Sequence, residues 1–140
     1  MRKVKTTPLQ REVLWSLAET GERGILAMLD ILRSRFPAVT NEALLKELER
    51  SLSILGRMGC LFLCWQYEDE RRPVRFEERR ALSLESLLCW DEASKHWAVR
   101  GQASPVLKDI IVQLTKGGVE VLELIARQYD GAPVWRQGAK

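Results

Sequence analysis

The sequence is poor in histidine and cysteine, two residues that many enzyme active sites and metal centres use. Its 140 residues include a single histidine, His96, and three cysteines. It contains no G-x-S-x-G, no H-E-x-x-H and no glycine-rich phosphate-binding motif, and these are signatures of common catalytic and nucleotide sites. We therefore predict neither an enzyme nor a bound cofactor.

The cysteines are few and odd in number. Cys60, Cys64 and Cys89 do not suit a disulfide framework, and they predict a reducing, cytoplasmic environment. Together with His96 they would make four zinc ligands, but zinc cysteines usually come in close pairs on turns. Cys60 and Cys64 instead lie on one apolar segment, where a free cysteine behaves as a small hydrophobic residue. No metal site is predicted.

Long apolar runs and a strong excess of one charge are also lacking. No run approaches the roughly 20 residues that span a bilayer. The charged first five residues are not followed by an apolar segment, so we expect no signal peptide and no membrane contact. The 22 basic and 19 acidic residues leave a net charge of +3. This permits nucleic-acid binding without the clustered excess typical of a dedicated binder.

Apolar residues make up 46% of the sequence, which is enough for one domain with a hydrophobic core. We expect that domain at residues 1–130, followed by a flexible tail at 131–140. Its longest helical pattern is residues 40–58, with Thr40 as N-cap and Gly59 as the left-handed residue that ends it. A buried stripe of leucines is predicted at Leu44, Leu48, Leu52 and Leu55. The opposite face carries Glu42, Lys46, Glu49, Arg50, Ser53 and Arg57.

Two helices are predicted before this one and a strand directly after it. The first begins at Pro8, with Thr7 and Gln10 forming a capping box, and the second covers residues 24–35. Residues 23–25 would alternatively form a short strand. Further strands are expected at 60–67 and 109–114, and Thr115 is expected to cap a last helix at 116–127.

The 69–108 segment has a less regular pattern. Residues 68–73 are interpreted as a turn or loop, 74–76 as a short strand, and 77–88 as either a helix or a loop. Residues 87–100 predict a β-hairpin in which Trp90 and Trp97 face each other across the two strands. A second loop is expected at 101–105.

The order helix, helix, helix, strand, loop, strand, capped helix resembles the winged helix-turn-helix domain. The pattern Ala43-Leu44-Leu45-x-x-Leu48, continuing to Leu55-x-x-Met58-Gly59-Cys60-Leu61, is similar to the recognition helix, closing glycine and first wing strand of bacterial regulators of the PadR and MarR kind. Val112-Gln113-Leu114-Thr115-Lys116-Gly117-Gly118 resembles a second wing strand that runs into the closing helix. The resemblance covers residues 8–67 and 109–127.

The expected fold is therefore α+β, a winged helix-turn-helix with three N-terminal helices, a β-wing with an inserted hairpin, and a C-terminal helix. Wings are usually short, whereas roughly 40 residues separate the two strands here. Either the wing is elaborated by residues 69–108, or the chain is another kind of α+β domain.

The resemblance implies a sequence-specific DNA-binding transcription regulator that is cytoplasmic and acts as a homodimer. Helix 40–58 would enter the major groove of double-stranded DNA, and a basic wing would lie on the backbone. Against this, Glu42 and Glu49 share the helix face and would repel phosphates, and glutamates alternate with the wing arginines. The residues expected to contact DNA are Thr40, Asn41, Lys46, Arg50, Ser53 and Arg57 on the helix, and Arg71, Arg72 and Arg75 in the wing.

Two other functions stay open on the sequence alone. One is a winged-helix module that binds a protein partner through the Trp90 and Trp97 hairpin and binds no nucleic acid, since tryptophan is enriched at interface hot spots. The other is a single-strand or RNA binder that uses exposed aromatic residues. Helix 116–127 or hairpin 87–100 is expected to form the dimer interface, and Trp135 is a candidate for an intermolecular contact.

Overall fold

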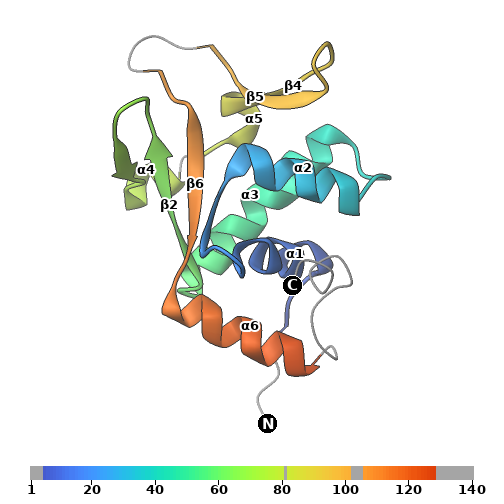
Figure 1. The fold of residues 1–140 in the computed structure, drawn as a ribbon, viewed down its shortest axis with the longest axis vertical. Helices are drawn as coiled ribbons and strands as arrows, with labels where there is room; N and C mark the ends of the chain where they lie inside the picture. The colour runs from blue at the N-terminus through green and yellow to red at the C-terminus, as the bar shows by residue number, and fades with distance from the viewer. Residues whose placement is uncertain (1–4, 81, 102–105, 129–140) are drawn as a thin grey trace.

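The fold combines α-helices with an antiparallel sheet (Figure 1). It is seen in a computed structural model that describes residues 5–80, 82–101 and 106–128. The helices in these residues are α1 (Pro8–Leu17), α2 (Ile25–Arg35), α3 (Asn41–Arg57), α4 (Phe76–Arg80), α5 (Leu84–Leu87) and α6 (Lys116–Gln128). The strands are β1 (Glu22–Gly24), β2 (Leu61–Gln66), β3 (Arg71–Pro73), β4 (Leu88–Asp91), β5 (His96–Val99) and β6 (Asp109–Leu114).

Strand β6 is the centre of the main sheet. Within the described residues the order is β1-β6-β2-β3, and every pairing is antiparallel. The longest pairing joins β2 to β6, from Leu61 opposite Leu114 to Gln66 opposite Asp109. Strands β4 and β5 form a separate hairpin. The chain thus leaves the sheet after β3 and returns to its middle at β6.

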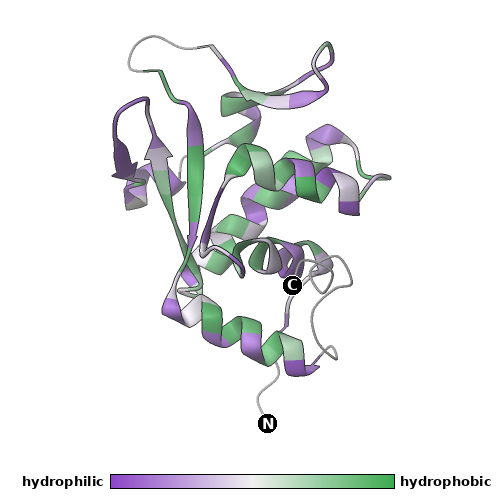
Figure 2. Cartoon of the chain, viewed as in Figure 1, coloured by the Kyte–Doolittle hydropathy of each residue, from purple (hydrophilic) through white to green (hydrophobic). Residues whose placement is uncertain are grey.

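The core lies between the helices and one face of this sheet. Helices α1 and α2 contact β6, and α3 contacts β2. The leucine stripe of α3 faces this core, because Leu44, Leu48 and Leu55 are fully buried and Leu52 is nearly so. The predicted inward face of helix 40–58 is therefore confirmed. Helix α6 also contributes to the core: Figure 2 shows hydrophobic and hydrophilic positions along its length, and its Leu122 and Ile125 are buried.

Most of the predicted helix boundaries follow from caps that form as expected. Thr7 and Gln10 make the predicted capping box, with bonds of 3.0 and 3.1 Å between each side chain and the other residue's backbone N–H. Thr40 Oγ1 accepts from the Ala43 N–H at 3.1 Å. Gly59 has φ +78°, the left-handed value that ends α3. Thr115 Oγ1 accepts from the Gly118 N–H at 3.0 Å and caps α6.

The structure corrects the prediction at two places and decides between two predicted alternatives at a third. The strand predicted at 74–76 lies at Arg71–Pro73 instead, because these residues pair with Cys64–Gln66 on β2. Residues 22–24 form β1, which agrees within one residue with the alternative strand predicted at 23–25, and α2 therefore starts at Ile25 and not at Gly24. The 77–88 segment forms two short helices, α4 and α5, rather than one helix or a loop.

The insert, residues 69–108, is folded onto the helices. Helix α5 contacts α3, and β5 contacts α2. In Figure 1 the β4–β5 hairpin lies beyond α2, at the opposite end of the molecule from α6. The predicted loop at 101–105, apart from Gly101, and the tail at 131–140 with Trp135 lie outside the described residues. None of the helices in the described ranges has the length and apolar content that crossing a bilayer requires.

Candidate nucleic-acid interface

The outer side of α3 carries a row of polar side chains that we call the α3 ridge: Lys46, Arg50, Ser53 and Arg57. All four residues are exposed, with 60% of the Lys46 side chain and 72% of the Arg50 side chain accessible to solvent. Burial of the leucine stripe on the other side of α3 forces this row outward, because the two rows lie on opposite faces of one helix. The ridge thus presents three cations to solvent.

Two of these cations have carboxylate neighbours on α3 itself. Lys46 Nζ lies 3.1 Å from Glu42 Oε1, and the hydrogen bond from Lys46 to Glu42 raises the pKa of the lysine. Arg50 Nη1 lies 3.8 Å from Glu47 Oε1. Solvent-exposed ion pairs of this kind contribute little to stability and are screened by salt. They leave both cations available to a stronger polyanion such as a phosphate backbone.

Thr40 and Asn41, two predicted DNA contacts, use their side-chain oxygens inside the chain. Thr40 caps α3, and Asn41 Oδ1 accepts from Arg33 Nη1 at 2.7 Å. Arg33 Nη2 also donates to the carbonyl oxygens of Phe36, at 2.6 Å, and of Val39. These bonds hold the turn between α2 and α3. Direct contact of Thr40 or Asn41 with DNA stays a prediction.

The predicted wing arginines are placed by β3 and the segment after it, all exposed to solvent. Arg71 Nη1 lies 3.1 Å from Glu22 Oε1 on β1, and this hydrogen bond is the main cause of the lowered pKa of Glu22. Arg72 donates from Nη2 to the Tyr67 hydroxyl at 2.9 Å, and its guanidinium lies 5.2 Å from the centre of the Tyr67 ring. Arg75 is exposed beyond the end of β3. In Figure 2 β3 and the turn that leads into it are coloured as hydrophilic.

Glu49 has a role that its place on the helix face did not predict. Its side chain is half-buried, and Oε1 accepts from the backbone N–H of Leu84 at 2.7 Å. Leu84 is the first residue of α5, so Glu49 satisfies a free N–H at the start of that helix. Glu49 therefore does not stand on a fully open face as expected, and repulsion of phosphates by its charge stays a prediction. The Glu49 side chain ties the insert to α3.

A second glutamate, Glu78 on α4, ties the insert to the sheet. Its Oε2 accepts from the indole N–H of Trp65 on β2 at 3.0 Å, and its Oε1 accepts from the Arg75 N–H at 3.0 Å. Sequence reasoning treated Glu78 only as one of the charges that neutralise the arginines. A buried strand tryptophan, which needs a partner for its N–H, was the available signal that such a carboxylate exists.

The cysteines and histidine do not gather. Cys60 and Cys64 are buried, Cys89 is half-buried and His96 is exposed on β5. Burial raises the pKa of the Cys60 and Cys64 thiols, which makes them less reactive at neutral pH. Across the described ranges, no group of three or more His, Cys, Asp or Glu side chains is placed to hold a metal ion.

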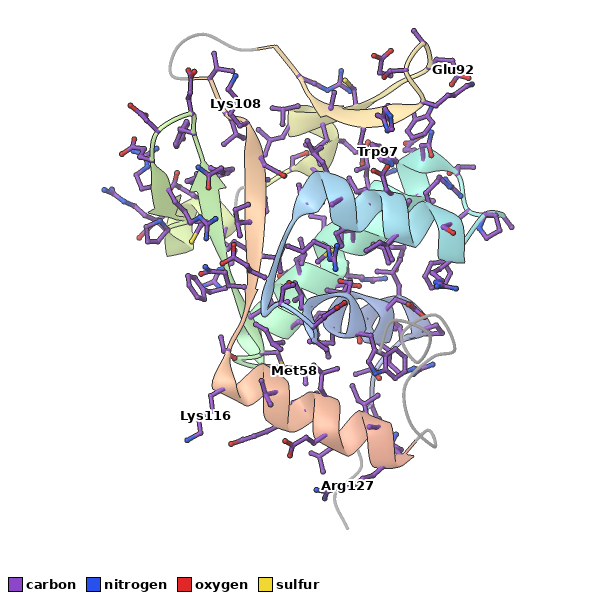
Figure 3. All side chains as sticks on the ribbon, viewed as in Figure 1. Met58, Glu92, Trp97, Lys108, Lys116 and Arg127 are labelled. Carbon is purple, nitrogen blue, oxygen red and sulfur yellow. The ribbon has the colours of Figure 1, made fainter. Side chains whose placement is uncertain are left out.

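The tryptophans of the β4–β5 hairpin face each other, as predicted. Trp90 lies directly opposite Trp97, with ring centres 5.4 Å apart and planes at 71°. Trp97 is only 5% exposed and lies on the side of the hairpin toward α2 (Figure 3), while Trp90 is half-buried and donates from Nε1 to Glu92 at 2.8 Å. Trp97 thus packs the hairpin toward α2, and Trp90 packs against Trp97. Binding of a protein partner through this pair stays a prediction.

Helix α6 also packs against its own chain. It contacts α1, and Val119 is 44% exposed on the flank of its buried side. Scans against protein-family models, curated proteins and solved structures find no match for this chain.

Proposed function

We propose that this protein is a winged helix-turn-helix regulator that binds double-stranded DNA through α3, with β2 and β6 as the wing strands and the arginines on β3 and just after it as the basic part of the wing. The observation that carries the proposal is the α3 ridge, in which Lys46, Arg50 and Arg57 are exposed and have no stronger partners than surface glutamates in the described part of the chain. A helix of this kind fits the major groove, and its cations bind phosphates.

The arrangement of strands supports the same proposal. Helices α1, α2 and α3 precede β2, and β2 pairs with β6 over six residue pairs, as two wing strands would. Arg71 and Arg72 stand on β3, at the edge of that sheet, where a duplex lying along the wing would meet them. On this proposal the insert is an enlargement of the wing.

A cytoplasmic homodimer is part of the proposal. A twofold pair would place two α3 helices into successive major grooves about 34–36 Å apart. The exposed flank of α6 around Val119 is one surface from which such a dimer would form. The dimer would then repress or activate transcription by binding a DNA site that consists of two half-sites.

The experiment is a fluorescence-anisotropy titration of a mixed-sequence duplex over a series of salt concentrations. The double variant Lys46→Ala with Arg50→Ala should bind more weakly than wild type. Its plot of log K against log salt should also be shallower by about 1.8, because each lost phosphate contact removes about 0.9 from the slope. A matched control is Arg127→Ala, because Arg127 lies at the far end of α6 (Figure 3) and should leave both quantities unchanged.

Two results would overturn the proposal. One is wild-type protein that fails to bind duplex at micromolar concentration and low salt. The other is a double variant whose affinity and salt slope equal those of wild type.

The second candidate, a protein-interaction module of the same fold, is favoured by one specific observation. Glu49 and α5 cover one flank of α3, so less of the helix surface is open to contact with a DNA groove. Absence of duplex binding would favour this candidate, and competition between single- and double-stranded oligonucleotides separates it from a single-strand binder.

A further inference from the structure

A pocket of about 600 Å³ lies between α3 and the insert, beside the start of the sheet. Its volume falls in the range of about 300–1,000 Å³ that small-molecule sites occupy. Its apolar wall comes from three different parts of the chain, namely Ile54 on α3, Leu63 on β2 and Leu82 in the insert. Because no single element makes this wall, the pocket exists only when the insert is folded onto α3.

The two glutamates described above attach the insert on either side of the pocket. Glu78 fastens α4 to Trp65 of β2, and Glu49 fastens the start of α5 to α3. Between these anchors, a Cβ added at Gly56 of α3 would lie 3.1 Å from Arg79 Nη1. The guanidinium of Arg79 is thus brought close to the α3 backbone, and it lines the pocket.

The polar side of the pocket is strongly basic. Arg50, Arg57 and Arg79 line it, and Glu49 is its one acidic lining residue among the described residues. Three positive charges against one negative charge give the lining a formal charge of +2. One oxygen of Glu49 is already bonded to the Leu84 N–H. Arg57 makes neither a hydrogen bond nor an ion pair with any residue that the structure describes.

We propose that this pocket binds a small organic anion, an apolar body that carries a carboxylate or a similar oxyanion. The body would lie on Ile54, Leu63 and Leu82, which removes apolar surface from water. The oxyanion would lie between Arg50 and Arg57, since a guanidinium donates two parallel hydrogen bonds to such a group. Ser53, also in the lining, adds a hydroxyl donor. This proposal goes beyond DNA binding and is tested without DNA.

The probe is 8-anilinonaphthalene-1-sulfonate, which joins an apolar aromatic body to an oxyanion and fluoresces in apolar surroundings. Titration into wild-type protein should saturate at one site per chain. The double variant Arg50→Gln with Arg57→Gln should weaken this binding at least tenfold. Ser53→Glu, which puts a carboxylate at an exposed position of the pocket, should do the same.

The control variant is Arg127→Gln, an exposed arginine on α6 that contributes nothing to the pocket. It should bind the sulfonate as wild type does. The neutral N-phenyl-1-naphthylamine, which lacks the sulfonate, should show affinities that differ less than twofold among all these proteins. Circular dichroism and the thermal midpoint of each variant confirm that the fold is retained.

Wild-type protein without one-site saturation would overturn the proposal. So would equal sulfonate affinity in the double variant and in Arg127→Gln, because the fluorescence would then arise elsewhere on the surface. A loss of binding to the neutral naphthylamine that matches the loss of sulfonate binding would show that the arginines shape the pocket without binding the anion, and it would also overturn the proposal.

Discussion

Asp109, the first residue of β6, supplies the capping group that α2 lacks. The N-cap of α2 is Gly24, which has no side chain to offer. Asp109 Oδ1 accepts from the Leu26 N–H at 3.3 Å and from the Ile110 N–H at 2.8 Å, and the carboxylate also receives a bond from the Ile25 N–H. A Cβ added at Gly24 would lie 2.1 Å from Asp109 Oδ2. The carboxylate therefore fills the space that any larger residue at 24 would need.

The replacement Asp109→Ala should destabilise the protein by about 1–2 kcal/mol. Loss of a capping side chain costs about 0.5–2 kcal/mol, and the half-buried site limits how well water replaces the lost acceptor. Asp109→Asn keeps one acceptor oxygen and should cost less than half as much at pH 7. Urea denaturation followed by tryptophan fluorescence measures both free energies of unfolding. Equal stability of wild type and Asp109→Ala would refute the idea that Asp109 caps α2.

The same carboxylate makes a prediction about pH. Burial raises the pKa of Asp109 above its ordinary 3.8, although the three backbone N–H groups act in the opposite direction. The folded state then holds this proton more tightly than the unfolded chain does. Its contribution to stability is fully present below pH 3.8 and is lost as the pH rises through the folded-state pKa.

The free energy of unfolding of wild type relative to that of Asp109→Asn should therefore be highest at the acid end of a pH series. Its stability relative to that variant should decline as the pH rises above 3.8. The exposed carboxylates with lowered pKa, such as Glu22 and Asp91, act in the opposite direction but are present in both proteins and cancel in the difference. A difference that grows with pH would show that the bonds from the backbone outweigh the cost of burial.

Two further substitutions test how α6 and the insert are attached. Gly118→Ala should destabilise the protein by about 1–3 kcal/mol in urea denaturation, because the new Cβ would lie 2.1 Å from the Cys60 carbonyl oxygen. Gly101→Ala is the control, because nothing lies within 4 Å of a Cβ added there. Equal effects of the two substitutions would contradict the tight packing of α6. Glu49→Ala should raise the rate of amide hydrogen exchange at Leu84, whereas Glu47→Ala, at an exposed position of the same helix, should leave that rate unchanged. Unchanged exchange at Leu84 in Glu49→Ala would argue against the Glu49 cap.

The sequence predicted those parts of the fold whose causes lie close together in the chain. The capping box at Thr7, the N-cap at Thr40 and the left-handed Gly59 each act within about four residues of the helix end that they determine. The leucine stripe of α3 is equally local, since its period follows from the helix geometry alone. The Trp90–Trp97 pairing is local in the same way, because the two apolar runs of the hairpin are separated only by a short polar segment.

The sequence did not predict features that depend on distant contacts. Strand β3 contains two arginines and a proline, which disfavour a strand, and it forms because β2 offers a free edge. The sequence left residues 23–25 open between helix and strand, and the pairing of Gly24 with Ile111 of β6 decides for the strand. The role of Glu49 requires Leu84, 35 residues further along. A helical wheel assigns Glu49 to a face, but it cannot say what will lie against that face.

The insert changes what the resemblance to winged-helix regulators implies for α3. Because α5 and the bond from Leu84 to Glu49 cover one flank of the helix, a duplex would approach from the side of Lys46, Arg50 and Arg57. Arg50 and Arg57 also line the pocket between α3 and the insert. The cations that a phosphate backbone would use are thus the ones that an organic anion would use, so the two proposed ligands compete for shared donors. Competition of that kind is the simplest way in which a small acid would release such a protein from DNA, and it needs no change in the fold.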